Sequence, residues 1–457
     1  MTSTTAPPAP DSPSSLPRLR HEAGTTPAVA SSRGRRPRGH IGWVVAGSLA
    51  TGLLAGVLLV AAPFIPAAES GVTGAVLCGF GLGWAMLALL SGRFTDQPQP
   101  WAAAPALFMG LSGLLLVAFG SSVHEVLTWV WPPTLLALVI WMVVRARREL
   151  RSPSRRLLLY PVIATLALAS VGGGYQAVRE SADAGAYPPP GRLIDVGGHR
   201  LHLNCTGSGS PTVVLEPGAG GKSSDLGWVT PAVARDTRVC VYDRAGRGWS
   251  EPAATPQDGT QIATDLHTLL QRGDVPGPYV LAGHSFGGLY VLTFAAPYPD
   301  EAAGMVLVDS TAPAQAVKAR TTPPGDGSSY DLTSRVSALV STLARLGLGR
   351  LVGAPTVSAL RSTIDEYVQG GASVEQAASL RGFADKPLVV LTAGRGSAAG
   401  WSAKQDALAR LSTNSSHRLI EGATHASLIY DEEDAAATTH AILDVVASLR
   451  RTEPLVK

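Results

Sequence analysis

The sequence predicts a mostly parallel α/β sheet domain with a helical cap, preceded by an all-α transmembrane bundle. Three observations predict this arrangement. Five long uncharged apolar runs fill the first part of the 457-residue chain. Strand-like and helix-like segments then alternate from Gly191 to Lys457. One long stretch between Asp309 and Lys386 contains no clear strand and interrupts that alternation.

The first third of the chain carries most of its apolar excess. Only 16% of all residues are charged and the mean hydropathy is +0.18, which is too apolar for one soluble domain of this length. A helix needs about 20 mostly apolar residues to cross the hydrocarbon core of a bilayer. Five successive runs are near or above that length: residues 41–68, 71–92, 101–122, 126–144 and 157–178. We therefore expect residues 41–178 to form five transmembrane helices, the fifth weakened by three consecutive glycines at 172–174.

Arginines alternate from loop to loop between these runs. Lys and Arg are absent from residues 66–70 and from the loop around residue 124, but abundant before the first run and after the fourth. The positive-inside rule places arginine-rich loops in the cytoplasm. We therefore expect a multi-pass protein of the cell membrane with a cytoplasmic N-terminus and an extracytoplasmic C-terminal domain. The net charge of +3 then reflects arginines beside membrane lipid and does not indicate nucleic-acid binding.

Two segments without apolar periodicity flank the spans. Residues 1–40 are rich in Pro, Ser, Thr, Ala and Arg, which predicts a disordered cytoplasmic tail. A cleaved signal peptide ending near residues 67–68 is the alternative, but the long polar lead favours an uncleaved anchor. Residues 179–190 end in three prolines and are predicted to be a short, stiff linker.

Residues 191–457 are expected to form one large domain. Helix-like stretches separate most of its strand-like runs, which is typical of a parallel sheet covered on both faces. The predicted strands are residues 193–196, 201–204, 212–215, 238–242, 279–281, 305–308, 388–391 and 418–420. Apolar residues at helical spacing predict a helical cap at about residues 313–386, whose apolar stripe is expected to pack against the sheet domain.

Ser285 is the centre of a G-x-S-x-G motif at residues 283–287, directly after a predicted strand and before a helix-compatible stretch. A serine on a sharp strand-to-helix turn needs glycines two positions away, so that the chain can fold tightly and present its hydroxyl. The following helix directs its first N–H groups towards a developing oxyanion. A Gly-rich turn that merely contains serine is the alternative, but the strand and helix around it favour a nucleophile. The neighbouring His284 is expected to point away.

A serine nucleophile needs a base, and that base needs an orienting group. His425 is favoured among the ten histidines because it follows the last predicted strand, at the edge of the sheet that also carries Ser285. Asp309 ends another strand at this edge and is favoured over Asp406, which lies in a predicted helix. The turn after residues 388–391 contains no carboxylate. A loop histidine and a helix-capping aspartate are the ordinary alternatives.

Two backbone N–H groups are candidates for an oxyanion hole, those of Phe286 and Ala219. The nearby Gly-Lys-Ser at residues 221–223 suggests a phosphate-binding loop, but Glu216 occupies the position of the required first glycine. No cluster of His, Cys and Asp has metal-ligand spacing. We therefore expect neither a cofactor nor a metal.

These motifs resemble those of the α/β-hydrolase superfamily, in its serine esterase/lipase-like branch. The resemblance covers about residues 191–457 and rests on the G-x-S-x-G motif, on a D-x-x-G-x-G-x-S turn that begins at Asp243, and on the order Ser, Asp, His. It implies the strand order 1-2-4-3-5-6-7-8, with strand 2 antiparallel, and a structural role for Asp243. It also places Cys205 and Cys240 on adjacent strands and so implies a disulfide, which an extracytoplasmic location would permit. Pro217-Gly218 departs from the family's usual His-Gly, and the family's usual acid after strand 7 is missing.

The expected function is that of a membrane-anchored serine hydrolase acting on a small-molecule ester or a lipid-like substrate. An amidase, a peptidase or a cofactor-free haloperoxidase-type enzyme could use the same residues. A different class of function is also open, in which the spans form a sensor and an inactive hydrolase fold serves as its ligand-binding ectodomain. The intact Ser/His pair and the lack of charges within the spans favour the enzyme.

Overall fold

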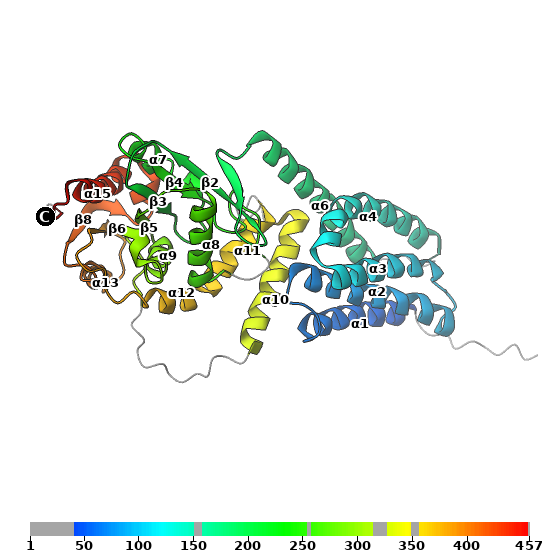
Figure 1. Ribbon diagram of the computed structural model, residues 1–457. Coiled ribbons are helices and arrows are strands. Elements are labelled where there is room, and N and C mark those ends of the chain that lie inside the picture. Colours follow the sequence, from blue (N-terminus) through cyan, green and yellow to red (C-terminus); the bar gives the residue numbers. More distant parts are fainter. Residues whose placement is uncertain (1–40, 150–157, 254–256, 314–326, 349–355, 456–457) are drawn as a thin grey trace, which may run out of the picture.

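The computed structural model describes residues 41–149, 158–253, 257–313, 327–348 and 356–455. The N-terminal part of the chain forms a helix bundle and the C-terminal part forms a sheet domain (Figure 1). Helix α10 (Gly327–Leu343), which belongs to the predicted cap, lies between the two parts. The predicted tail, residues 1–40, lies outside the described residues.

The bundle consists of long apolar helices. Its members are α1 (Ile41–Ala61), α2 (Glu69–Phe94), α3 (Ala103–Phe119), α4 (Ser121–Glu149) and α6 (Tyr160–Ala186). Within the described residues, five helices are long and apolar enough to cross a membrane. Large apolar side chains face outward, and Leu107 and Leu168 are 72% and 73% exposed. This is the surface that a bilayer would cover, and the predicted region of apolar membrane helices is confirmed.

Helix α6 runs further than the sequence predicted. The expected linker, residues 179–190, is helical up to Ala186, so that its first part was wrongly assigned. Side-chain pairs one helical turn apart stabilise this extension: Gln176 donates to Glu180 at 2.8 Å, and Arg179 lies 3.8 Å from Asp183. The three glycines at 172–174 do not interrupt the helix.

One eight-stranded sheet forms the centre of the C-terminal domain. Its strands are β1 (Arg192–Asp195), β2 (Arg200–Thr206), β3 (Thr212–Glu216), β4 (Val239–Tyr242), β5 (Tyr279–His284), β6 (Ala302–Val308), β7 (Leu388–Arg395) and β8 (Ser415–Thr424). Their order is β1-β2-β4-β3-β5-β6-β7-β8, and β2 is antiparallel to both of its neighbours. The order implied by the resemblance is therefore confirmed. Strand β8 is longer than the expected residues 418–420.

Helices cover both faces of this sheet, because alternate side chains of each strand point to opposite faces. On β5, Leu281 packs in the core beneath α8 and α9, whereas Val280 and Ala282 pack in the core beneath α7 and α15. The covering helices are α7 (Val229–Val233), α8 (Gly259–Arg272), α9 (Phe286–Ala295), α13 (Trp401–Ala409), α14 (Ser427–Tyr430) and α15 (Glu432–Arg451).

The cap is helical, as predicted, but it packs differently from the expectation. Besides α10 it contains the turn η4 (Ala344–Leu348) and helices α11 (Val357–Val368) and α12 (Gly370–Ala377). Helix α10 contacts α2 of the bundle, and the buried Arg335 donates to the carbonyl oxygen of Ile65 at 2.8 Å. Val336 of the predicted apolar stripe is 52% exposed. The stripe therefore does not pack fully against the sheet domain, because α10 lies against the bundle.

Candidate active site

Ser285 occupies the sharp turn between β5 and α9. Its backbone has φ +55° and ψ −121°, a positive-φ conformation that only a tightly constrained site imposes on a residue with a side chain. The glycines of the motif permit this turn. A Cβ on Gly283 would lie 2.5 Å from the carbonyl oxygen of Gly287, and one on Gly287 would lie 2.3 Å from that of Glu216. The spacing of the motif is therefore a steric requirement of this turn.

Asp309 and His425 meet at the carboxyl edge of the sheet. Asp309 directly follows β6, and His425 directly follows β8. His425 Nδ1 lies 2.6 Å from Asp309 Oδ2, although the two residues are 116 positions apart in the sequence. The Asp309 side chain is only 3% exposed, whereas that of His425 is 47% exposed. A buried carboxylate thus holds an imidazole that remains open to a substrate.

Two further donors bind the other oxygen of the Asp309 carboxylate. Trp401 Nε1 lies 2.7 Å from Oδ1, and the N–H of Ala393 lies 3.2 Å from it. Burial alone would raise the pKa of Asp309, but these donors and His425 outweigh it and hold that pKa below its usual value. Asp309 is therefore an acceptor at neutral pH, which fixes the proton of neutral His425 on Nδ1 and leaves Nε2 free to accept another.

The turn after β7 contributes to the site without supplying an acid. It has no carboxylate, but Ala393 and Trp401, on either side of the turn, both donate to Asp309. Asp406, the alternative acid, lies in α13 and contacts a different histidine: its Oδ1 is 2.7 Å from His417 Nδ1. The structure thus brings Asp309, and not Asp406, to His425.

The sequence predicted that His284 points away from the site, but its side chain faces His425 instead. Its ring lies 4.6 Å from that of His425, centroid to centroid, and its Nε2 donates to the backbone carbonyl oxygen of His425 at 2.9 Å. Burial, together with the neighbouring His425, lowers the pKa of His284 to about 4. His284 is therefore neutral at pH 7 and anchors the His425 turn. The expectation failed because the imidazole of His284 finds its hydrogen-bond acceptor in the turn that carries His425, 141 positions further along the chain.

Ala219 and Phe286, the predicted oxyanion donors, lie in the turn after β3 and at the start of α9. Phe286 is the first residue of α9, so its N–H has no acceptor within the helix. The amide of Ala219 has no hydrogen-bond partner in the part of the chain that the structure describes. A Cβ on the adjoining Gly218 would lie 3.1 Å from Ser285 Cβ, so this turn runs directly past the serine. Ser285 Oγ itself has no hydrogen bond to the described residues, as is common for catalytic groups without substrate.

A family model provides independent support for the fold. The model described as the alpha/beta hydrolase fold matches residues 211–345, which contain β3 to β6, Ser285 and Asp309. Together with the strand order, this match decides the fold. The C-terminal domain has the α/β-hydrolase fold.

Relatives of this hydrolase-fold chain match parts of it. An uncharacterised protein of Schizosaccharomyces pombe is 35% identical over 156 residues, 28% of this chain and 29% of that protein. An uncharacterised vacuolar membrane protein of Saccharomyces cerevisiae is 33% identical over 98 residues, 21% of this chain and 15% of that protein. A thermophilic esterase from Thermogutta terrifontis is similar in structure, with a TM-score of 0.42 and 20% identity, over 56% of this chain and 99% of its own. The chain thus spans less than a third of the length of these two curated relatives.

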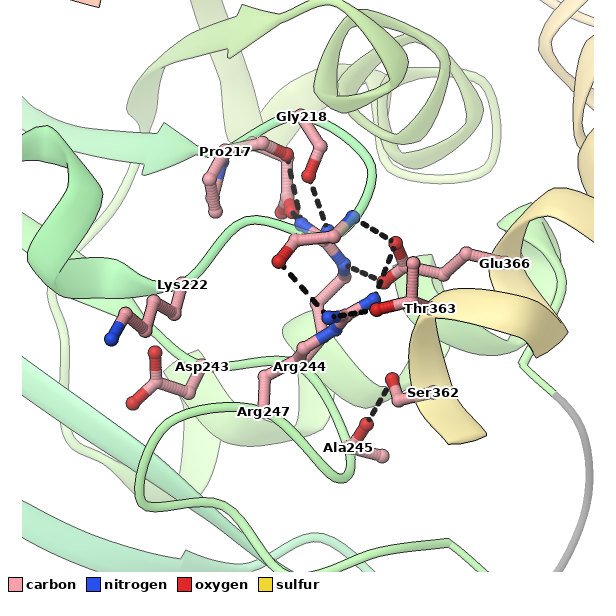
Figure 2. Close-up of polar contacts among 12 residues, drawn as sticks. Pro217, Gly218, Lys222, Asp243, Arg244, Ala245, Arg247, Ser362, Thr363 and Glu366 are labelled. Carbon is pink, nitrogen blue, oxygen red and sulfur yellow. Dashed lines mark hydrogen bonds and ion pairs between the residues drawn. The ribbon is translucent and has the colours of Figure 1, made fainter. Parts of the chain in front are cut away.

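A buried ion cluster connects the turn after β3 of the hydrolase domain to the cap. Its members are Glu216, Arg244, Arg247 and Glu366, all between 0 and 3% exposed in their side chains. Figure 2 shows that Arg244 and Arg247 both point towards Glu366. Glu366 of α11 accepts hydrogen bonds from Arg244 Nε at 2.8 Å and from the N–H of Gly220 at 2.7 Å. The Arg244 guanidinium also donates to two carbonyl oxygens of the turn, those of Pro217 and Gly218. The cap therefore helps to fix the backbone next to Ala219.

Replacing Glu366 with glutamine is expected to destabilise the protein by about 3 kcal/mol, because it leaves part of the buried guanidinium charge unpaired. Burial raises the pKa of Glu366, but Arg244 and Arg247 outweigh it and hold that pKa below its ordinary value. The stabilisation is therefore complete above the unfolded-state pKa of about 4.3 and is lost as the pH falls through the lower folded-state pKa. Thermal unfolding of the full chain at several pH values measures both effects.

The pH dependence of the melting temperature distinguishes the loss of the Glu366 charge from a general loss of packing. The difference in melting temperature between wild type and Glu366→Gln should be large at pH 7 and shrink below pH about 4. Glu432→Gln, at an exposed position on α15, is the matched control and should melt like wild type. A difference that stays constant down to pH about 3 would show that the Glu366 charge does not stabilise the fold.

Asp243 has the structural environment that the resemblance implied. Its carboxylate lies 2.8 Å from His202 Nδ1 and accepts the N–H groups of Ser223 at 2.7 Å and Trp249 at 3.1 Å. It therefore holds its own turn together. A disulfide joins Cys205 of β2 to Cys240 of β4. Among the described residues, no group of three His, Cys, Asp or Glu side chains is arranged to hold a metal ion.

Proposed function

We propose that this protein is a membrane-anchored serine hydrolase that cleaves carboxylic esters. Ser285 would be the nucleophile, His425 the general base and Asp309 the orienting acid. The observation that carries the proposal is the 2.6 Å hydrogen bond between His425 and the buried Asp309, at the sheet edge where Ser285 is held in its strained turn. A nucleophile, a base and an orienting carboxylate at one edge are the set that acyl transfer requires.

The first half of the reaction forms an acyl-enzyme. Ser285 Oγ attacks the ester carbonyl carbon while its proton passes to Nε2 of His425. Asp309 stabilises the imidazolium that results, and it remains ionised because its pKa is lowered. The negative oxygen of the tetrahedral intermediate would accept hydrogen bonds from the N–H groups of Phe286 and Ala219. When the intermediate collapses, His425 returns the proton to the leaving alcohol.

The second half releases the acid. A water molecule gives a proton to His425 and attacks the acyl carbon, which forms a second tetrahedral intermediate in the same oxyanion site. Collapse of this intermediate breaks the bond to Ser285 Oγ, and the proton on His425 returns to the serine. The His284 side chain supports both halves, because its hydrogen bond to the His425 carbonyl fixes the turn that carries the base.

The hydrolase domain would face the outside of the cell membrane. Arginine-rich sequence stands before α1 and after α4, which places the end of α6 outside under the positive-inside rule. The disulfide between Cys205 and Cys240 supports this orientation, because disulfides persist in oxidising compartments.

A membrane-impermeant fluorophosphonate probe tests both the nucleophile and the orientation. When intact cells express the full chain, we expect the probe to label this protein, because the probe phosphonylates an activated serine outside the membrane. Ser285→Ala should abolish the label. Ser379→Ala, at an exposed position just after α12 of the cap, is the matched control and should retain it.

Other labelling results would each contradict a different part of the proposal. Equal labelling of wild type and Ser285→Ala would exclude Ser285 as the nucleophile. Labelling of the wild type only after lysis would place the domain on the cytoplasmic side. An unlabelled wild type that is present at the surface would contradict the enzyme and favour the ligand-binding ectodomain.

A further inference from the structure

A partly open cavity of about 380 Å³ lies among the helices of the bundle, where the bundle meets the cap. Helices α2, α3, α4 and α6 and the cap all contribute to its wall. Most of the wall is apolar, with large side chains such as Phe80, Trp84, Met109, Leu116, Trp131 and Leu166. The cavity belongs to the bundle and to the junction with the cap, and none of the residues assigned to ester cleavage lines it.

The cavity is elongated along the helix axes. On α2 its lining extends from Thr73 to Trp84, and on α6 it extends from Val162 to Gly173. Eleven helical steps correspond to about 16 Å. A slot of this length fits an extended apolar chain better than a compact ring system.

Polar groups gather where the slot meets the cap. Arg345 of the cap donates through Nε to Glu69 at 2.7 Å, and His124 lies 3.8 Å from the same carboxylate. The hydroxyl groups of Thr73 and Thr342 lie 2.7 Å apart beside them. The charges of Arg345 and Glu69 balance each other, so this end offers hydrogen bonds without a net charge.

A void of this size and composition is suited to an amphiphilic occupant. Protein interiors leave few voids larger than a water molecule, and an apolar cavity of about 150 Å³ already binds benzene. Water would find few hydrogen-bond partners along the apolar wall, so a hydrocarbon chain would fill the cavity more favourably than water. Arg345 lines this end of the slot and would repel a cationic head group, whereas its ion pair with Glu69 offsets the positive charge that would attract an anionic one, so this end favours an uncharged polar head.

We propose that this cavity is a binding site for a neutral lipid with a single acyl chain, such as a monoacylglycerol. The acyl chain lies between α2, α3, α4 and α6, and the head group lies against Thr73, Thr342 and Arg345. Because three cap residues, Thr342, Arg345 and Leu346, line the slot, the bound lipid also joins the bundle to the cap. The proposal goes beyond ester cleavage and does not depend on Ser285.

Photo-crosslinking with a monoacylglycerol that carries a diazirine in its acyl chain tests the proposal. The experiment uses the full chain with Ser285→Ala in phosphatidylcholine nanodiscs. The substitution prevents hydrolysis of the probe, and the nanodiscs keep detergent out of the slot. Mass spectrometry is expected to find the crosslinks on peptides that contain Phe80, Met109 or Trp131. Excess unlabelled monoacylglycerol should reduce them at least fivefold.

Two neighbouring positions on α6 provide the matched variants. Ala169 lines the slot, whereas Leu168 faces outward and is 73% exposed. Ala169→Phe fills the slot and is expected to reduce crosslinking at least fivefold, whereas Leu168→Phe should leave it unchanged. Gly173→Leu fills the cap end of the slot instead, where a Cβ would meet no atom closer than 3.7 Å, and is the second variant if Ala169→Phe does not fold.

Equal crosslinking of the Ser285→Ala protein and of a folded Ser285→Ala protein that also carries a filling substitution would overturn the site. If a lysophosphatidic acid of the same chain length competed more strongly than monoacylglycerol, the proposed preference for a neutral head group would be wrong. Because every arm carries Ser285→Ala, the results stand whether or not Ser285 is a nucleophile. Failure of the lipid site and failure of the proposed hydrolase can therefore be told apart.

Discussion

Replacing Asp309 with asparagine is expected to lower kcat for ester hydrolysis by about a thousandfold, with little change in KM. The amide would present an N–H donor to His425 Nδ1 in place of an acceptor. Neutral His425 would then carry its proton on Nε2, the atom that has to take the proton from Ser285. Steady-state hydrolysis of a p-nitrophenyl ester by the purified full chain measures the effect.

Asp406→Asn is the matched control for Asp309→Asn. Asp406 contacts His417 and its side chain is 53% exposed, so we expect kcat within about twofold of wild type. If Asp406→Asn lost more activity than Asp309→Asn, the assignment of the orienting acid would be wrong. Retention of full activity by Asp309→Asn would exclude its role in orienting the base.

Replacing Gly287 with alanine is expected to destabilise the hydrolase domain by about 3 kcal/mol. The added Cβ would lie 2.3 Å from the carbonyl oxygen of Glu216 and 2.8 Å from that of Pro217. Both contacts are with backbone, which cannot rotate away as a long side chain could. Thermal unfolding should show a lower melting temperature, and labelling of Ser285 by a fluorophosphonate probe should fall with it.

Gly371→Ala in helix α12 of the cap is the matched control for Gly287→Ala. A Cβ at this position would meet no atom within 4 Å, and alanine favours a helix more than glycine does. We expect a melting temperature equal to or slightly above that of wild type. Equal stability of the two alanine variants would contradict the steric account of the turn at Ser285.

The parts of the fold that were predictable are those set by local pattern. Apolar runs of spanning length predicted the bundle, and short apolar runs bounded by turns predicted the strands. The G-x-S-x-G motif located the turn at Ser285 because only that spacing of glycines permits it. His425 and Asp309 were found because both follow strands whose carboxyl ends share one edge of the sheet.

The parts that were missed depend on contacts between distant segments. Trp401 gives no local signal, since its role is to donate to a carboxylate 92 positions away. Glu366 lies in a cap helix whose sequence does not show that it reaches the buried Arg244. The direction of the His284 side chain depends on its hydrogen bond to the distant His425 carbonyl, and the helical extension to Ala186 includes side-chain pairs within a polar segment.

The sequence by itself determined which stretches are helix, strand and span, because backbone sterics and the period of apolar residues act over a few neighbours. It also determined which residue types could carry acyl-transfer chemistry. Only the tertiary structure decided which acid meets His425, how the cap holds the turn at Ala219, and that the bundle encloses a slot beneath the cap. Hydrogen bonds and voids of this kind depend on positions within about 3 Å, and those positions arise only when segments far apart in the chain pack together.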